Sequence, residues 1–264
     1  MILEAQIRRI GAFALAGVDA FGSLAGLAAQ TVRRAGRAHR KDVVEQMFQI
    51  GNRSLLFVFV TLGFLGMVLV FQTCLQLGRV TGDLSQVGAE FIKIMTHEFG
   101  PTITAMMLAT RVGAGIAAEI GSMTVTEQVD ALRMCAVDPV EYLVVPRFLA
   151  ALVMELVLTV LGVVVAIGLG ALTAALAFRV NPHVFIDASH VARADVLVGF
   201  VKCEAYGAAI PIVSAFCGLR ARGGSEGVGA ATKLAVIGSS FAVLVLDFLL
   251  STLGYFFLQH GGAR

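Results

Sequence analysis

Five separate segments of this chain are each long and apolar enough to cross a lipid bilayer as a helix. A helix needs about 20 mostly apolar residues to span the hydrocarbon core. Few or no charged residues interrupt these segments, whereas charges gather between them. We therefore predict an all-α integral membrane protein. Its five transmembrane helices are expected at residues 54–76, 101–121, 146–178, 196–219 and 234–258.

The composition argues against the soluble classes of protein. Of the 264 residues, 58% are hydrophobic and only 14% are charged, whereas about 25% are charged in an ordinary soluble domain. A soluble fold of this length could not bury so much apolar surface. The net charge of +2 is also too small to indicate a nucleic-acid partner. Soluble enzymes and nucleic-acid-binding proteins are thus disfavoured.

The first 45 residues differ from the predicted spans. Residues 5–32 mix apolar side chains with a few charges, and five basic residues follow between positions 33 and 41. This pattern predicts an N-terminal amphipathic helix in the membrane interface, with a basic flank near anionic headgroups. A sixth span is the alternative. We accordingly divide the chain into an interfacial segment, 1–45, and a membrane domain, 46–260.

The distribution of basic residues predicts the orientation of the chain. Cytoplasmic segments of membrane proteins carry an excess of Lys and Arg. An N-in, C-out topology places only Arg79, Arg179, Arg193 and Arg264 outside. It places eleven basic residues inside, namely Arg33, Arg34, Arg37, Arg40, Lys41, Arg53, Arg133, Arg147, Arg220, Arg222 and Lys233.

Glycine, proline and alanine positions predict how the spans are built. Residues 85–121 would form one helix of about 55 Å, so we expect a break at Gly100-Pro101, where proline loses a helix hydrogen bond. Residues 86–99 would then lie at the membrane edge. Two stripes of small residues at four-residue spacing predict close helix contacts, either internal or between two copies of the chain. The stripes are Ala105, Ala109, Gly113, Ala117 and Gly121, and Gly162, Ala166, Gly170 and Ala174.

Charged residues inside predicted spans are costly, so they indicate either function or internal pairing. Arg111, Glu119 and Asp247 are such residues. We expect internal pairs, for instance Arg111 with Glu119 or with Asp247. A carboxylate relay in a proton-coupled carrier is the alternative. Lys202 and Glu204 are expected near the outer boundary, where they could reach lipid headgroups.

Apparent catalytic motifs fail on closer inspection. Residues 224–229 have the glycine spacing of a P-loop, but Ala230-Ala231 stands where Lys and Ser/Thr are required. His97-Glu98 begins like a zinc-protease motif, but the second His is missing. The four cysteines lack metal-site spacing. We therefore predict no catalytic residue, metal or cofactor in this chain, which must take energy from a partner or an ion gradient.

Residues 97–150 carry the most specific signal in the sequence. They contain HEFGP at 97–101, TRVGAGIAAEIGSMTVTEQ at 110–128, DP at 138–139 and PR at 146–147. This pattern closely resembles the MlaE/YrbE family, the permease subunits of ABC-type lipid transporters, and the likeness covers about residues 33–258. His97 and Thr110 depart from the pattern, because many members carry Arg and Gly at these positions.

The resemblance implies partners, a location and a cargo. A homodimer of the chain would lie in the bacterial inner membrane as a multi-pass protein. An ABC ATPase that binds ATP and Mg would dock on the cytoplasmic side, and a periplasmic MCE-domain protein would carry the phospholipid. An ion-coupled secondary transporter of a hydrophobic substrate is the alternative, although no internal repeat typical of such carriers is visible.

The resemblance also assigns a coupling element in the largest predicted cytoplasmic loop. A short amphipathic helix there would transmit motion of the ATPase. A helix that rests on the membrane, or simple helix capping by the first residues, is the alternative. The coupling residues are Thr126, Glu127, Gln128, Val129, Asp130, Leu132 and Arg133.

A second set of residues would line a lipid pocket at the dimer centre. Apolar side chains from the first span would form its wall, and polar groups at the predicted helix break would form its mouth. The alternative for Glu98 is that it satisfies backbone donors at the break. The pocket residues are Leu69, Val70, Thr73, Leu77, His97 and Glu98.

Overall fold

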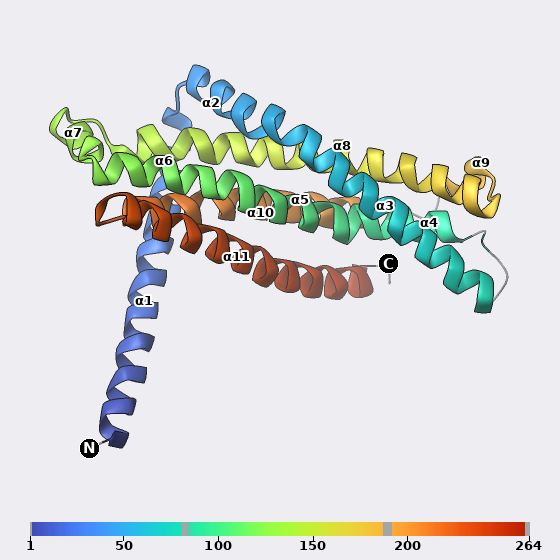
Figure 1. Cartoon of the computed structure of the whole chain (residues 1–264), viewed down its shortest axis with the longest axis horizontal. Helices are drawn as coiled ribbons and strands as arrows, with labels where there is room; N and C mark the ends of the chain where they lie inside the picture. Colours follow the sequence, from blue (N-terminus) through green and yellow to red (C-terminus); the bar gives the residue numbers. More distant parts are fainter. Residues whose placement is uncertain (1, 81–83, 85, 187–191, 262–264) are drawn as a thin grey trace.

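Five long helical rods lie side by side, and a further helix projects from one end of the bundle (Figure 1). The computed structural model describes residues 2–80, 84, 86–186 and 192–261. Within these ranges there is no strand, and five helices are long and apolar enough to cross a membrane. The prediction of an all-α protein with five membrane-spanning helices is confirmed. The rods are Arg40–Val80, Val87–Val125, Val140–Phe178, Arg193–Leu219 and Gly224–Phe256.

Three rods are composite, because π-helical turns join their α-helical sections. In the first rod, a π turn (Phe48–Asn52) joins α2 (Arg40–Met47) to α3 (Arg53–Val80). The third rod begins with a π turn (Val140–Val144) and continues as α8 (Val145–Phe178). The second rod consists of α4 (Val87–Ile94), a π turn (Met95–Phe99), α5 (Gly100–Leu108), a π turn (Ala109–Gly113) and α6 (Ala114–Val125). The last two rods are α10 (Arg193–Leu219) and α11 (Gly224–Gly261), and the short α9 (Pro182–Phe185) follows α8.

Successive rods run in opposite directions, so the connecting segments gather at two ends of the bundle. One end, which we call the α7 end, carries α7 (Gln128–Met134) and the turn between α10 and α11 (Figure 1). The other, the α9 end, carries α9. The helix α1 (Ile2–Arg34) leaves the α7 end and runs crosswise to the rods (Figure 1). That is the direction expected of a helix lying in the plane of a membrane that the rods cross.

The α3–α8 contact explains one stripe of small residues. A Cβ atom added to Gly66 would lie 2.5 Å from the carbonyl oxygen of Ala166, and one added to Gly170 would lie 2.9 Å from Val70 Cγ2. Real side chains cannot approach so closely, so the two backbones pack directly against each other. Ala166, Gly170 and their stripe partners on α8 are buried. This stripe therefore forms an internal contact.

The second stripe packs against α10 and α11. A Cβ atom at Gly113 would lie 2.9 Å from Ser214 Oγ, and one at Gly218 would lie 3.0 Å from the carbonyl oxygen of Ala117. All five stripe residues of the second rod are buried. Both small-residue stripes therefore build the interior of one chain.

The predicted break at Gly100-Pro101 is wrong, because the second rod stays helical from Val87 to Val125. The reason is the π turn at Met95–Phe99, where the N–H of Gly100 donates to the carbonyl of Met95, five residues earlier. A π turn re-routes the helix hydrogen bonds where a proline ring would otherwise clash with the preceding turn. Residues 87–99 are thus the first part of the same continuous rod.

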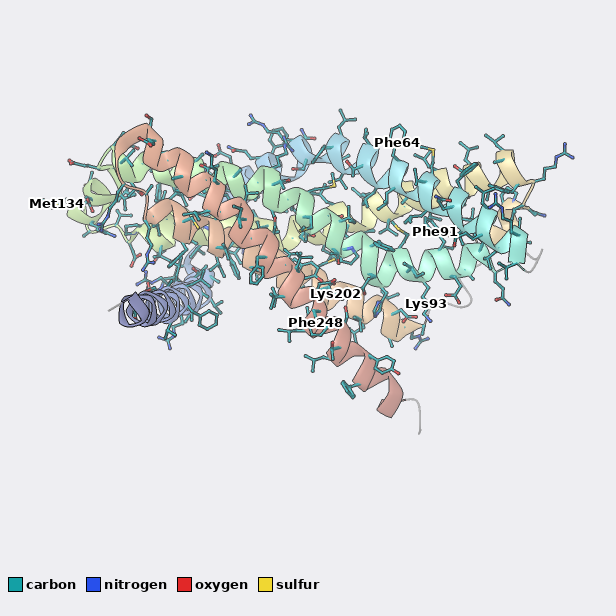
Figure 2. All side chains as sticks on the ribbon, turned by 60° about the horizontal axis from the view of Figure 1, so that its bottom comes forward. Phe64, Phe91, Lys93, Met134, Lys202 and Phe248 are labelled. Atoms are coloured by element: carbon teal, nitrogen blue, oxygen red, sulfur yellow. The ribbon has the colours of Figure 1, made fainter. Side chains whose placement is uncertain are left out.

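Large apolar side chains cover the outer surface of the bundle. Phe64 on α3 is 61% exposed and Phe248 on α11 is 72% exposed, and the two rods present further Phe, Leu and Val side chains (Figure 2). Exposed apolar surface of this extent requires lipid tails or another protein as its environment. The fold therefore supports a multi-pass membrane protein.

Candidate functional site

Lys202 on α10 occupies the centre of a polar cluster inside the bundle (Figure 2). Its side chain is fully buried, at 0% exposure. Its Nζ donates to Glu98 Oε2 over 2.5 Å, to Asp247 Oδ1 over 2.9 Å and to Ser251 Oγ over 2.8 Å. An ammonium group has three N–H donors, so every donor of this buried charge has an acceptor.

Asp247 on α11 accepts hydrogen bonds from two further rods. Its Oδ1 accepts from the hydroxyl of Tyr206 on α10 over 2.7 Å and from Oγ1 of Thr102 on α5 over 3.1 Å. The cluster therefore joins the second, fourth and fifth rods. We call the following residues the Lys202 cluster: Glu98, Thr102, Lys202, Tyr206, Asp247 and Ser251.

Glu98 forms the more open side of the Lys202 cluster. Its Oε1 accepts from Ser251 Oγ over 3.0 Å, and its Oε2 lies 3.0 Å from Nδ1 of His97. The side chains of Glu98 and His97 are 34% and 22% exposed, whereas that of Lys202 is closed off. One ammonium group thus serves two carboxylates, and the His97 ring lies at the accessible edge.

The expected internal pairing is confirmed for Asp247 and Glu119, but with other partners than predicted, and it is wrong for Arg111, which pairs with no carboxylate among the described residues. Asp247 pairs with Lys202 and not with Arg111. Glu119 pairs with the buried Arg147, with 2.8 Å between Glu119 Oε2 and Arg147 Nη2. Arg111 instead donates from Nη1 to Ser54 Oγ over 2.6 Å. Arg147 also donates from Nη1 to the carbonyl oxygen of Leu143, so its guanidinium group links Glu119 on the second rod to the third rod.

The expectation that Lys202 reaches the headgroups is also wrong, because its Nζ points into the bundle. The sequence did contain a signal for this cluster. Three spans each carry a polar pair at four-residue spacing, and residues four apart share a helix face. The pairs are Glu98 with Thr102, Lys202 with Tyr206, and Asp247 with Ser251.

The predicted lipid-pocket residues of the first rod lie on α3. Val70 is fully buried against α8, where Gly170 makes room for it. Leu69 and Leu77 are partly buried and pack against the core of the bundle. The hydroxyl of Thr73 donates to the carbonyl oxygen of Leu69 over 2.8 Å, within the helix. Leu69, Thr73 and Leu77 are therefore the members of this set on α3 that keep some accessible surface.

The predicted coupling residues form α7 and the turn before it. Val129 is buried, and Leu132 packs beside it against Ile116, Ile120 and the start of the third rod. The apolar face of α7 is thus held by the chain's own bundle. The exposed residues of α7 and the turn before it include Glu127, Gln128, Asp130, Arg133 and Met134.

The turn before α7 does not cap the helix with a side chain. Glu127 adopts the left-handed conformation with φ of 61°, and no side chain at this position bonds the first N–H groups of α7. The hydroxyl of Thr126 donates instead to the carbonyl of Ser122 over 2.8 Å. Asp130 and Arg133 form an ion pair over 2.8 Å along the exposed face. Capping therefore does not account for Thr126 or Glu127.

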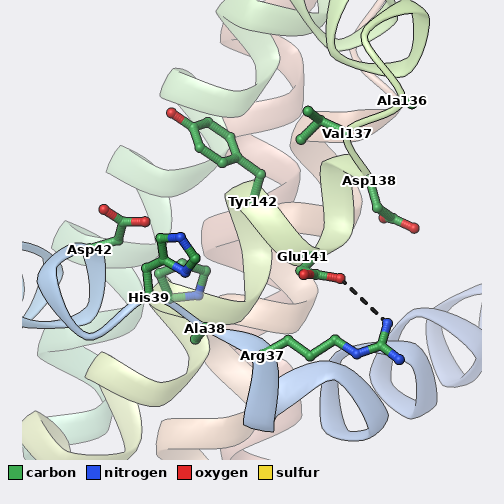
Figure 3. Close-up of a pocket in the computed structure, with 10 residues that line it drawn as sticks. Arg37, Ala38, His39, Asp42, Ala136, Val137, Asp138, Glu141 and Tyr142 are labelled. Carbon is green, nitrogen blue, oxygen red and sulfur yellow. Dashed lines mark ion pairs between the residues drawn. The ribbon is translucent and has the colours of Figure 1, made fainter.

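A cavity lies between the start of α2, with the turn before it, and the segment after α7 (Figure 3). Arg37 pairs with Glu141 over 3.8 Å, as Figure 3 shows, and Arg34 pairs with Asp138. Asp138 Oδ1 also accepts the N–H of Val140 over 2.9 Å at the start of the third rod. The basic flank of α1 is therefore tied to the α7 end by acidic residues of the chain itself.

Comparison with known proteins places these features in a family. A probable ABC transporter permease protein of Synechocystis is 36% identical over 83% of this chain and 83% of its own length. One from Rickettsia felis is 35% identical over 80% of this chain and 82% of its own. The chloroplastic protein named trigalactosyldiacylglycerol 1 of Arabidopsis thaliana is 31% identical over 89% of this chain and 67% of its own.

The family model described as Permease MlaE matches residues 43–253. This range contains the first rod from Val43, the next three rods in full, α11 as far as Leu253, the whole Lys202 cluster and α7. Together with the relatives, the match shows that this multi-pass membrane protein belongs to the MlaE permease family and is a permease subunit of the ABC transporter class.

Proposed function

We propose that this chain is the permease of an ABC-type transporter that moves glycerophospholipid between the bacterial inner membrane and a periplasmic MCE-domain carrier. Two copies would form the membrane core. A partner ATPase would bind ATP and Mg and supply the energy, so the chain itself would not be an enzyme. Membership of the MlaE permease family over residues 43–253 carries the proposal. The diacylglycerol lipid in the name of the Arabidopsis relative supports the choice of cargo.

The geometry of α7 supports a docking role. Its apolar side is packed into the bundle, so the helix is held rigidly, while Gln128, Asp130, Arg133 and Met134 are exposed. A short helix fixed in this way moves together with the second and third rods. A partner that binds its exposed face can therefore transmit motion into the bundle.

The Lys202 cluster and α3 support a lipid site. The accessible edge at Glu98 and His97 offers polar groups, and the exposed Phe64 and Phe71 on α3 offer apolar surface. A phospholipid presents the same combination of a polar headgroup and acyl chains. The site would be completed by the second copy of the chain in the proposed dimer.

An ion-coupled secondary transporter is the second candidate, and the intramembrane carboxylates favour it. Both carboxylates of the Lys202 cluster are, however, occupied by Lys202 and by hydroxyl donors. Such an arrangement suits a fixed clamp between rods better than a relay of protons. The two candidates make opposite predictions about the source of energy.

Reconstitution distinguishes the candidates. The permease is purified in mild detergent together with the neighbouring ATPase, placed in vesicles with a fluorescent phospholipid, and offered a lipid-free MCE protein as acceptor. ATP-dependent transfer that persists after ionophores collapse the ion gradients is the expected result. Transfer that needs a gradient and not ATP would support the secondary transporter. Failure of any ATPase to co-purify would contradict the ABC proposal.

A further inference from the structure

Arg53 and Arg111 line the same open cavity on the surface of the bundle, near the α7 end. The cavity has a volume of about 540 Å³, and its remaining lining is mostly apolar. The lining residues are Arg53, Leu56, Phe57, Val60, Thr110 and Arg111. Both arginines also line an adjoining smaller cavity, which extends towards Glu119 and Arg147. Both arginines therefore border two adjoining cavities, which we together call the groove.

Neither arginine has a carboxylate partner among the residues that the structure describes. Glu119, the acidic residue that lines the smaller cavity, pairs with Arg147 over 2.8 Å. Arg111 has one hydrogen bond, from Nη1 to Ser54 Oγ over 2.6 Å, and Ser54 is itself buried at 1% exposure. That bond fixes the direction of one guanidinium edge and leaves its other donors free. An arginine at membrane depth without a counter-ion is costly.

The groove changes from basic to apolar along α3. Arg53 begins α3, and Val60 follows seven residues later, about 10 Å deeper at 1.5 Å per residue. Leu56, Phe57 and Val60 are 74%, 47% and 49% exposed. A groove with two guanidinium groups at one end and exposed apolar side chains beyond them matches a molecule with an anionic head and a hydrocarbon tail.

We infer that the groove binds an anionic glycerophospholipid, whose phosphate lies between Arg53 and Arg111 and whose acyl chain follows Leu56, Phe57 and Val60. Guanidinium groups bind phosphate oxygens in paired hydrogen bonds. Two positive charges select a lipid with net negative charge over a zwitterionic one. This site lies at the α7 end and is distinct from the Lys202 cluster. It does not depend on the proposed transport function.

The sequence offers a clean reporter for the test, because the chain contains no tryptophan. Leu56→Trp places a single indole in the groove at a position that is already exposed. Val68→Trp, at a 57% exposed position further along α3, serves as the matched control outside the groove. Each protein is placed in nanodiscs that contain either brominated phosphatidylglycerol or brominated phosphatidylcholine as a minor component, since bromine quenches tryptophan only on contact.

The expected result is preferential quenching of the Leu56→Trp protein by the anionic lipid. Two basic residues near an anionic headgroup predict a preference of roughly thirtyfold. The Val68→Trp protein should show equal quenching by both lipids. Adding Arg53→Gln and Arg111→Gln to Leu56→Trp should remove the preference, whereas adding Arg40→Gln, an exposed arginine at the same end, should keep it.

Three outcomes would overturn the inference. Equal quenching of the Leu56→Trp protein by both lipids would exclude selectivity. An unchanged preference in the Arg53→Gln/Arg111→Gln protein would assign selectivity to other residues. Relief of quenching by millimolar inorganic phosphate would assign the groove to free phosphate. Arg53→Lys and Arg111→Lys keep the charges but lose the paired hydrogen bonds, so these variants should retain part of the preference for the anionic lipid. They also serve as a folding control, because a loss caused by misfolding would not be restored by lysine.

Discussion

Lys202 and Glu98 are 104 residues apart in the sequence, yet Nζ of the lysine lies 2.5 Å from Oε2 of the glutamate. The same Nζ reaches Asp247 on a third rod. A single buried cation thus connects three of the five rods. Among the residues that the structure describes, the cluster is the one place where charged side chains from three rods meet in the interior of the bundle.

Removal of this cation is expected to destabilise the bundle strongly. Lys202→Met leaves two carboxylates facing each other without a counter-charge, and breaking a buried ion pair costs about 3–5 kcal/mol. A large drop in the thermal unfolding temperature of the detergent-solubilised protein is expected. Lys93→Met replaces an exposed lysine in the first section of the second rod and should leave the temperature almost unchanged. Equal stability of the two variants would contradict a structural role for Lys202.

The close α3–α8 contact is expected to exclude even a methyl group at Gly66. Gly66→Ala places a Cβ 2.5 Å from the Ala166 carbonyl oxygen, so α3 and α8 must separate, at a cost of about 1–3 kcal/mol. Gly78→Ala, on the same helix, meets no atom within 4 Å and should stabilise the helix slightly. Relative to the unaltered protein, the thermal unfolding temperature should fall for Gly66→Ala and rise slightly for Gly78→Ala. Shifts of the same sign would argue against the close α3–α8 contact.

The exposed tip of α7 is expected to govern binding of the partner ATPase. Met134 is 88% exposed, and Met134→Asp puts a charge into any apolar contact at this point. Reduced co-purification of the ATPase and reduced ATP-dependent lipid transfer are expected, with normal stability of the permease. Cys135→Ser, at the next exposed position, is the control. Full co-purification with Met134→Asp would place the docking surface elsewhere.

Within the proposed lipid site, Leu69 is the informative position on α3, because Val70 is already committed to packing against α8. Leu69→Trp should reduce the phospholipid that co-purifies with the protein, as native mass spectrometry can measure. Val68→Trp adds the same bulk on the exposed side of the helix and should retain the lipid. Retention by both variants would remove Leu69 from the site.

Apolar length and small-residue spacing were sufficient to predict much of the fold. The five spans follow from their composition, and the stripes that contain Gly113 and Gly170 follow from four-residue spacing. The continuity of the second rod could not be predicted in this way. A proline normally ends a helix, and whether a π turn absorbs it depends on packing around Gly100 that only the folded chain provides.

The candidate site was predicted only in part. Glu98 and Asp247 were recognised, but Lys202 was assigned to the membrane surface because sequence does not give the depth of a residue in a tilted rod. The partners of Arg111 and Glu119 were mistaken for a related reason. Their separation of about two helical turns favours a pair along one helix, whereas Arg147 approaches Glu119 from the third rod.

The π turns of the second rod have a consequence for how side chains are directed around its axis. Each π turn contains one residue more than an α turn, and one residue corresponds to about 100° of rotation. The sections before Met95 and after Gly113 are therefore offset in phase from the section between them. Deleting one residue within either turn would return that turn to α-helical spacing and leave the side chains beyond it with nearly the same neighbours, whereas deleting one residue of α5 would rotate them by about 100°.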